Sequence, residues 1–350
     1  MRDVFELPII QAPMAGGPDS PALAAAVSGA GGLGSLGCAY AAPAEIEALA
    51  AAVRARTPRP FALNLFVRTD TRDTPDTRDT PDEPGADARV AAVLRPMRAE
   101  LGLADTIALG PELPRWDDQL EAVLRIAPRV FSFTFGVPSR DQLAALHARE
   151  IFVIGTATTV DEAGVLDELG VDAITAQGAE AGGHRGTFLG RFEDALVGTF
   201  ALVPQVVQRT RRPVIAAGGI MDGRGIRAAL ALGAKAVQLG TAFMACPEAG
   251  TSAPHRAALT SARATVITRA FSGRPARGIR NRMTDAFEAV APAPFPQQQR
   301  MTHELRRAAT AHARPDLMQL WAGQGAPLLR AMPAAELVAT LAIEAGLLDP

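Results

Sequence analysis

The chain has 350 residues and a mass of 36.5 kDa, enough for one large single-core domain or two smaller ones. Hydrophobic residues make up 48% and charged residues 21%, a balance that excludes wholesale disorder. A net charge of −2 provides no basic field for nucleic acid, and the two distant cysteines exclude a disulfide framework and a thiolate zinc site.

The N-terminal residues mix acids with bases and contain no apolar core, which is unlike a secretory signal peptide. Residues 20–44 carry no charge, but they are dominated by Ala and Gly rather than by large apolar side chains. A spanning helix needs about 20 predominantly apolar residues. We therefore expect a cytoplasmic protein that binds neither membrane nor nucleic acid, and the sequence leaves its oligomeric state open.

Eight short apolar runs recur along the chain, and most are followed by a stretch with helical periodicity. The expected strands are residues 7–11, 33–36, 61–66, 130–135, 151–156, 173–177, 213–217 and 236–240. Strands buried on both faces that alternate with helices are typical of a parallel α/β fold. Eight such units favour a closed (β/α)₈ TIM barrel over an open sheet.

Helices are expected between these strands, over residues 44–55, 88–101, 142–150, 160–169 and 225–232. Thr159 and Glu162 form a capping-box pattern at the start of one of them. Gly170 and Gly233 stand where a glycine would end two others.

A barrel of about 250 residues extends to roughly residue 265. We expect residues 1–265 to form the barrel and residues 266–350 to form a helical segment at its mouth, with helices near 298–312, 315–321 and 334–347. The polar segment 68–87 follows the third strand and contains the hexapeptide Thr-Arg-Asp-Thr-Pro-Asp twice. It is expected to be a long loop over the mouth, or equally an inert duplication in a surface loop.

Glycines follow the last two strands. Gly218 and Gly219 come directly before a helix that begins near Asp222, and Gly240 with Thr241 follows the eighth strand. Glycines let backbone N–H groups approach an anion, and a helix N-terminus adds a favourable dipole. The pattern predicts a phosphate site between strands seven and eight.

Residues 32–37 match the dinucleotide pattern GxGxxG, which is a competing hypothesis. That pattern requires a strand before it, a helix after it and an acidic residue about 20 positions later. Here a helix precedes the motif, the motif is itself a strand, and no acidic residue lies between Glu47 and Asp70. A Rossmann fold is therefore not expected.

The segment 177–186 concentrates the reactive groups, and glycines allow it to carry His184 into the mouth. Histidine titrates near neutrality, so His184 can bind an anionic substrate or accept a proton. It has no HxxxH or HxH partner, so no metal site is expected. The remaining histidines lie in polar helical stretches and are expected at the surface: His147, His255, His303 and His312.

The ordered set of segments resembles the nitronate monooxygenase family, formerly called 2-nitropropane dioxygenases, and most closely its class I members. The matching segments are residues 8–17, 64–66, 133–136, 176–186, 213–220 and 238–243, with weaker continuations at 277–282 and 320–325. The resemblance therefore covers most of the chain.

The resemblance implies a TIM barrel that binds FMN and oxidises alkyl nitronates, such as propionate 3-nitronate, with O₂ to a carbonyl compound and nitrite. His184 would face the substrate. The implied flavin contacts are Ala12, Pro13 and Met14 against the ring, Asn64 as a hydrogen-bond partner, Gln177 and Gly182 beside it, and Gly218, Gly219, Gln238, Leu239, Gly240 and Thr241 around the phosphate.

Class members often bring tyrosine and lysine from the C-terminal segment into the pocket, whereas residues 293–300 here contain neither. An NAD(P)H-dependent FMN reductase acting on quinones or enoyl thioesters is the alternative hypothesis, since such enzymes share the Gly-Gly-His core. His184 followed by Arg185 and Gly186 favours the monooxygenase. A flavin-binding barrel without activity is the third hypothesis.

Overall fold

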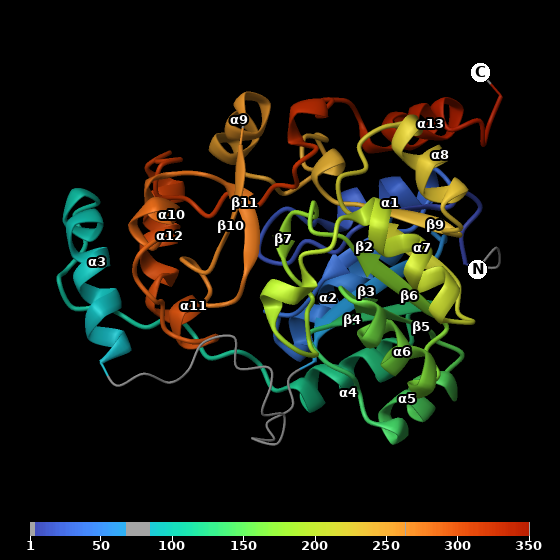
Figure 1. Cartoon of the computed structure of the whole chain (residues 1–350), viewed down its shortest axis with the longest axis horizontal. Helices are drawn as coiled ribbons and strands as arrows, with labels where there is room; N and C mark the ends of the chain where they lie inside the picture. Colours follow the sequence, from blue (N-terminus) through green and yellow to red (C-terminus); the bar gives the residue numbers. More distant parts are fainter. Residues whose placement is uncertain (1–3, 68–84, 263, 350) are drawn as a thin grey trace.

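In this computed structural model, which describes residues 4–67, 85–262 and 264–349, a barrel of strands and helices stands beside a smaller lobe (Figure 1). Most of the predicted loop 68–87, including both hexapeptides, lies outside the described residues. No helix in the described ranges combines the length and the apolar composition needed to cross a bilayer.

Eight parallel strands form the barrel in the order β1-β9-β8-β6-β5-β4-β3-β2. A parallel bridge between Ile10 and Leu33 joins the two end strands, and the Gln11 N–H donates to the Leu33 carbonyl at 2.9 Å. The predicted TIM barrel is thereby confirmed. Its strands are β1 (Ile9–Gln11), β2 (Gly34–Gly37), β3 (Phe61–Phe66), β4 (Val130–Thr134), β5 (Phe152–Ala157), β6 (Ala173–Gln177), β8 (Val214–Ala217) and β9 (Ala236–Leu239).

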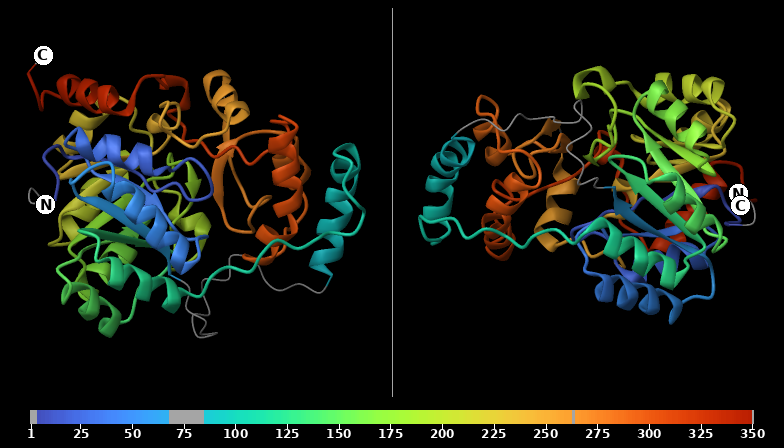
Figure 2. Two further views of the ribbon diagram at one scale, coloured as in Figure 1. Left: turned by 180° about the vertical axis from the view of Figure 1, so that it is seen from behind. Right: turned by 90° about the horizontal axis from the view of Figure 1, so that it is seen from below.

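Helices surround the barrel (Figure 2). Their apolar side chains share one core with those of the strands. They are α1 (Pro21–Gly29), α2 (Pro43–Arg54), α4 (Trp116–Ile126), α5 (Arg140–His147), α6 (Val160–Leu169), α7 (Thr199–Arg209), α8 (Gly223–Ala231) and α13 (Ala334–Glu344). The last helix packs against both α1 and α8. It therefore takes the place of the eighth helix, although about 90 residues separate it from β9.

Local sequence signals account for several of these elements. Thr159 and Glu162 form the predicted capping box at the start of α6, and Gly170 ends that helix with φ of 100°. Gly34, in the GxGxxG pattern, allows close packing, because a Cβ there would lie 2.0 Å from the Ala24 carbonyl oxygen. The motif thus lets α1 pack on β2, as expected for a strand rather than for a nucleotide loop.

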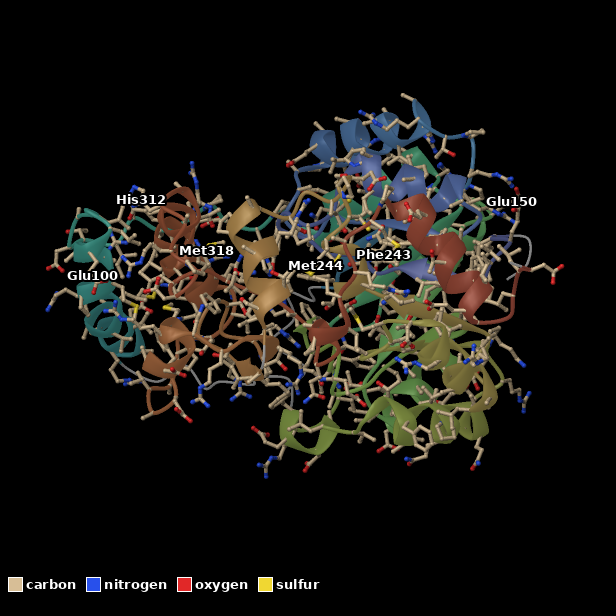
Figure 3. All side chains as sticks on the ribbon, turned by 90° about the horizontal axis from the view of Figure 1, so that it is seen from above. Glu100, Glu150, Phe243, Met244, His312 and Met318 are labelled. Carbon is tan, nitrogen blue, oxygen red and sulfur yellow. The ribbon has the colours of Figure 1, made fainter. Side chains whose placement is uncertain are left out.

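The smaller lobe combines two distant parts of the chain. Its elements are α3 (Ala86–Glu100), α9 (Ala253–Ser261), β10 (Thr265–Thr268), β11 (Ala276–Ile279), α10 (Arg282–Ala286), α11 (Gln297–Met301) and α12 (His303–Ala311). Val90, Leu94 and Met97 of α3 share one apolar core with Phe271 and Leu305. In Figure 3, Met318 and Glu100 mark this lobe, and Met244 lies where it meets the barrel. The boundary predicted at residue 265 falls at the start of β10.

Two expectations for the C-terminal region are wrong. Residues 315–321 form no helix; Trp321 instead makes an antiparallel bridge with Gly278. His255 is not a surface residue, since its exposed fraction is 7% and its Nε2 lies 3.1 Å from the Trp321 carbonyl oxygen. The helix at 315–321 and the surface position of His255 were both predicted from local sequence patterns. Such patterns carry no information about how the lobe docks on the barrel.

Candidate active site

A cavity lies at the carboxyl ends of the barrel strands, where proteins of this fold place their functional groups. It brings together residues from the ends of β1, β3, β6, β8 and β9. Every predicted site residue lines it: Ala12, Pro13, Met14, Asn64, Gln177, Gly182, His184, Gly218, Gly219, Gln238, Leu239, Gly240 and Thr241. The role of each residue stays a prediction.

Glycines form one end of the cavity. Gly218 and Gly219 follow β8 with φ of 111° and 76°, values that favour glycine, and α8 begins at Gly223. The amide N–H groups of Gly219 and Gly240 have no acceptor among the described residues. Unpaired N–H groups beside a helix N-terminus suit a phosphate or another anion. We refer to this end as the glycine end.

A carboxylate fixes the wall that follows β1. Asp19 accepts hydrogen bonds from the backbone N–H groups of Met14 and Gly37, both at 2.6 Å, and from the Gln11 side chain at 3.0 Å. Burial raises the pKa of Asp19 to about 7, and the three hydrogen bonds act in the opposite direction. Asp19 therefore holds the segment 12–14 against the cavity, a role that sequence reasoning missed.

Two amide side chains also organise the wall. Asn64 is buried and donates to the Ser132 hydroxyl at 2.9 Å. Gln177 donates to the His184 carbonyl oxygen at 3.0 Å and accepts from the Gly186 N–H at 2.8 Å. Gln177 thereby fixes both sides of the turn that carries His184.

His184 lines another part of the same cavity, on the short strand β7 (Gly183–His184), which pairs with β11. Its ring centroid is 6.1 Å from that of Phe66, 5.8 Å from that of Phe135 and 5.5 Å from that of Trp321. Its Nε2 lies 2.8 Å from the Ser272 hydroxyl. We refer to this region, made by His184 and the three aromatic residues, as the aromatic end.

Two arginines place positive charge near the aromatic end. The Arg274 guanidinium lies 4.0 Å from the centre of the Phe135 ring, and Arg306 lies close enough to act on both His184 and Tyr40. Burial, followed by the charges of Arg274 and Arg306, lowers the pKa of His184 to about 3. Burial raises the pKa of Tyr40 to about 12. Both side chains are therefore neutral near pH 7.

Arg185 stands next to His184 but does not line the cavity. Its guanidinium is buried and donates to the carbonyl oxygens of Gln177, Gly178 and Ala195 at 2.6–3.1 Å. Arg185 therefore stabilises the turn that carries His184 without contacting the cavity.

Sequence reasoning missed most of the aromatic end as part of the site. Tyr40, Phe135 and Trp321 line the cavity, and Ser272 contacts His184 from outside it. Tyr40 is the chain's only tyrosine, and Trp321 lies in a segment that carries the resemblance, so a weak signal existed for both. Ser272 had none.

Comparison with known proteins agrees with the fold and the site. The family described as Nitronate monooxygenase matches residues 1–344. A nitronate monooxygenase of Pseudomonas aeruginosa is 46% identical over 350 residues, covering 97% of this chain and 96% of the relative. The nitroalkane oxidase of Streptomyces ansochromogenes superposes with a TM-score of 0.90 at 41% identity, covering 99% and 97% of the two chains. FabK from Thermotoga maritima superposes with a TM-score of 0.76 at 29% identity, covering 99% and 95%.

The barrel, its strand-end cavity and these matches define a TIM-barrel oxidoreductase. Within that class, the chain belongs to the nitronate monooxygenase family of flavin-dependent enzymes. The family predicted from the sequence is confirmed.

Proposed function

We propose that the protein uses FMN and O₂ to oxidise alkyl nitronates to a carbonyl compound and nitrite. The observation that carries this proposal is the position of Arg274 and Arg306 behind the aromatic end: neither lines the cavity, but both lie close enough to lower the pKa of His184. A nitronate is an anion, and positive charge beside a partly desolvated cavity attracts it strongly. A neutral substrate would gain little from the same two charges.

The glycine end supports FMN as the cofactor. Gly218, Gly219, Gln238, Leu239, Gly240 and Thr241 would surround a single phosphate, Ala12, Pro13, Met14 and Asn64 would hold the ring, and Gln177 and Gly182 would lie beside it. The unpaired N–H groups of Gly219 and Gly240 fit one phosphate group. When bound, the flavin supplies the electron-transfer chemistry that no side chain here can perform.

The chain's own residues bind and orient the substrate. Phe66, Phe135 and Trp321 exclude water around the His184 ring, which strengthens each electrostatic contact made there. The three hydrogen bonds of Arg306 go to neutral oxygens of Thr302, Gln319 and Gln299, and no carboxylate among the described residues pairs with it. An anionic substrate would balance this charge.

Arg306 lines the adjoining hollow, which shares Pro18 and Tyr40 with the cavity, so it suits a nitronate whose second negative group extends past Tyr40, such as propionate 3-nitronate. Arg306→Gln should raise KM for propionate 3-nitronate about 10-fold more than for ethyl nitronate, which has no carboxylate. Arg307→Gln, an exposed neighbour on α12, is the matched control and should change neither value. Equal changes in KM for the two substrates would contradict the proposal that Arg306 binds the carboxylate of the substrate.

The decisive experiment is anaerobic mixing of the purified yellow protein with propionate 3-nitronate and, separately, with NADH. Denaturation should release FMN rather than FAD. We expect flavin absorbance to change rapidly with the nitronate and slowly or not at all with NADH. Rapid bleaching by NADH would favour the reductase instead, and a protein that takes up no FMN would refute both functions.

A further inference from the structure

Ser272 is a buried side chain that the proposed function leaves unused. It lies in the turn between β10 and β11, has no exposed surface and does not line the cavity. Its hydroxyl oxygen is 2.8 Å from Nε2 of His184. Ser272 can therefore influence the substrate only through His184.

The hydroxyl has one proton and three polar neighbours. Its oxygen accepts the N–H of Arg274 at 3.3 Å, and the Arg274 carbonyl oxygen also lies at 3.3 Å. The third neighbour, Nε2 of His184, is 0.5 Å closer than that carbonyl oxygen. The contact with Nε2 is the shorter of the two contacts open to this proton, which favours Ser272 as the donor to Nε2 over donation to the Arg274 carbonyl oxygen. A neutral imidazole that accepts at Nε2 carries its proton on Nδ1.

Nδ1 of His184 makes no hydrogen bond to any residue that the structure describes. The side chains packed around the ring are Phe66, Phe135 and Trp321, and none of them offers an acceptor for an N–H. The ring itself lines the cavity. A proton on Nδ1 is therefore free to bond a ligand there.

The charges around the ring keep this arrangement neutral. Among the residues that the structure describes, Arg274 and Arg306 are the charged groups that act on His184, and Tyr40 beside them stays protonated. Burial and the two arginines lower the pKa of His184 to about 3, far below the value near 7 that suits a general base at neutral pH. His184 is thus a poor proton acceptor and a competent hydrogen-bond donor.

We propose that Ser272 is a positioning residue that holds His184 in the Nδ1–H tautomer, so that His184 donates a hydrogen bond to an oxygen of the bound nitronate. The identity of the ligand rests on the proposed function, whereas the tautomer does not. The consequence is a site that receives a nitronate already deprotonated and does not remove a proton from a nitroalkane.

The test is nitrogen NMR of the oxidised holoenzyme labelled with ¹⁵N-histidine, with His184 assigned by its absence in His184→Asn. We expect the wild type to show a protonated Nδ1 and an unprotonated Nε2. Ser272→Ala should shift the ring toward a mixture of tautomers, and Ser272→Thr, which keeps the hydroxyl, should restore the wild-type pattern. A protonated Nε2 in the wild type would overturn the proposal without any variant.

Kinetics provide the second arm. Ser272→Ala should lower kcat/KM for a nitronate about 3- to 10-fold, and Ser272→Thr should recover most of the loss. Unchanged kcat/KM in Ser272→Ala would overturn the role of the tautomer in binding. If wild-type protein turns over no nitronate, the proposed function fails, and the NMR result still decides the tautomer.

Discussion

The two ends of the cavity differ in the groups that form them: one is made of backbone and the other of side chains. The glycine end consists of backbone at the ends of two adjacent strands, with N–H groups that a rigid barrel holds in place. The aromatic end consists of side chains from β3, β4, β7 and the lobe, held by contacts between His184, Phe135 and Trp321. Under the proposed function, the barrel would hold the phosphate in a fixed position, and the lobe would help to select the substrate.

Gly219→Val should have the largest effect and should abolish flavin retention. The added Cβ would lie 3.2 Å from the Glu180 Cβ, at a φ of 76° that β-branched residues avoid, and the side chain would obstruct the phosphate approach. Gly190→Val is the matched control, because Gly190 has φ of 72°, open space around it and no place in the cavity. The measurement is flavin absorbance per protein after gel filtration. Full flavin content in Gly219→Val would mean that the glycine end does not hold the phosphate.

His184→Ala should affect the aromatic end alone. A hydrogen bond to a charged group contributes about 1.5–3 kcal/mol, so kcat/KM for a nitronate should fall roughly 10- to 100-fold with flavin content unchanged. Turnover measured with the parent nitroalkane would then come from the nitronate it forms in solution, and it should fall by the same factor. A general base would instead lose about 10²–10⁴-fold on the nitroalkane and less on the nitronate. His312→Ala, on the exposed end of α12, should leave both values unchanged.

Thr241→Val should weaken the connection between the two ends. The Thr241 hydroxyl oxygen accepts the Gly323 N–H at 2.9 Å, which ties the barrel to the segment beside Trp321. Valine has the same shape but leaves that buried N–H without an acceptor, at a cost of about 1–3 kcal/mol in the free energy of unfolding. Thr241→Ser keeps the acceptor and should lose less than half as much in urea denaturation. Equal losses in the two variants would show that the methyl group, and not the hydroxyl, matters here.

The smallest effect concerns pH and His255, behind Trp321. Burial lowers the pKa of His255 to about 4 in the folded protein, against about 6.5 when unfolded. Between these values the unfolded chain binds more protons, so stability falls as pH drops from 6.5 toward 4, by at most about 1.4 kcal/mol per pH unit. His184 acts in the same direction down to about pH 3. His255→Gln should reduce the stability difference between pH 7 and pH 5 by roughly 1–2 kcal/mol; an unchanged difference would contradict the burial.

The contrast between the glycine end and the aromatic end also explains which features the sequence could predict. The barrel, the capping box at Thr159 and the glycine end follow from periodicity and from residues a few positions apart, so local patterns report them. His184 was found because its glycine-rich setting is also local.

The aromatic end depends on contacts across the whole chain. Ser272 meets His184 across 88 positions, and Trp321 reaches it only because the lobe docks on the barrel. The predicted helix at 315–321 and the predicted surface position of His255 failed for the same reason. A helical or polar pattern describes a single segment of the sequence, whereas docking depends on the surfaces of two segments that lie far apart in it.

The packing of α3 has a consequence for how the chain is made. Apart from neighbours such as Leu101 and Ala258, Val90, Leu94 and Met97 share their apolar core with residues from Ala270 onward, about 170 residues after α3 ends. At a synthesis rate of about 5–20 residues per second, the helix waits roughly 10–35 s on the ribosome with that face unsatisfied. The nascent chain thus carries an amphipathic helix with an uncovered apolar face through about half of its translation, which makes α3 a segment that a chaperone would shield.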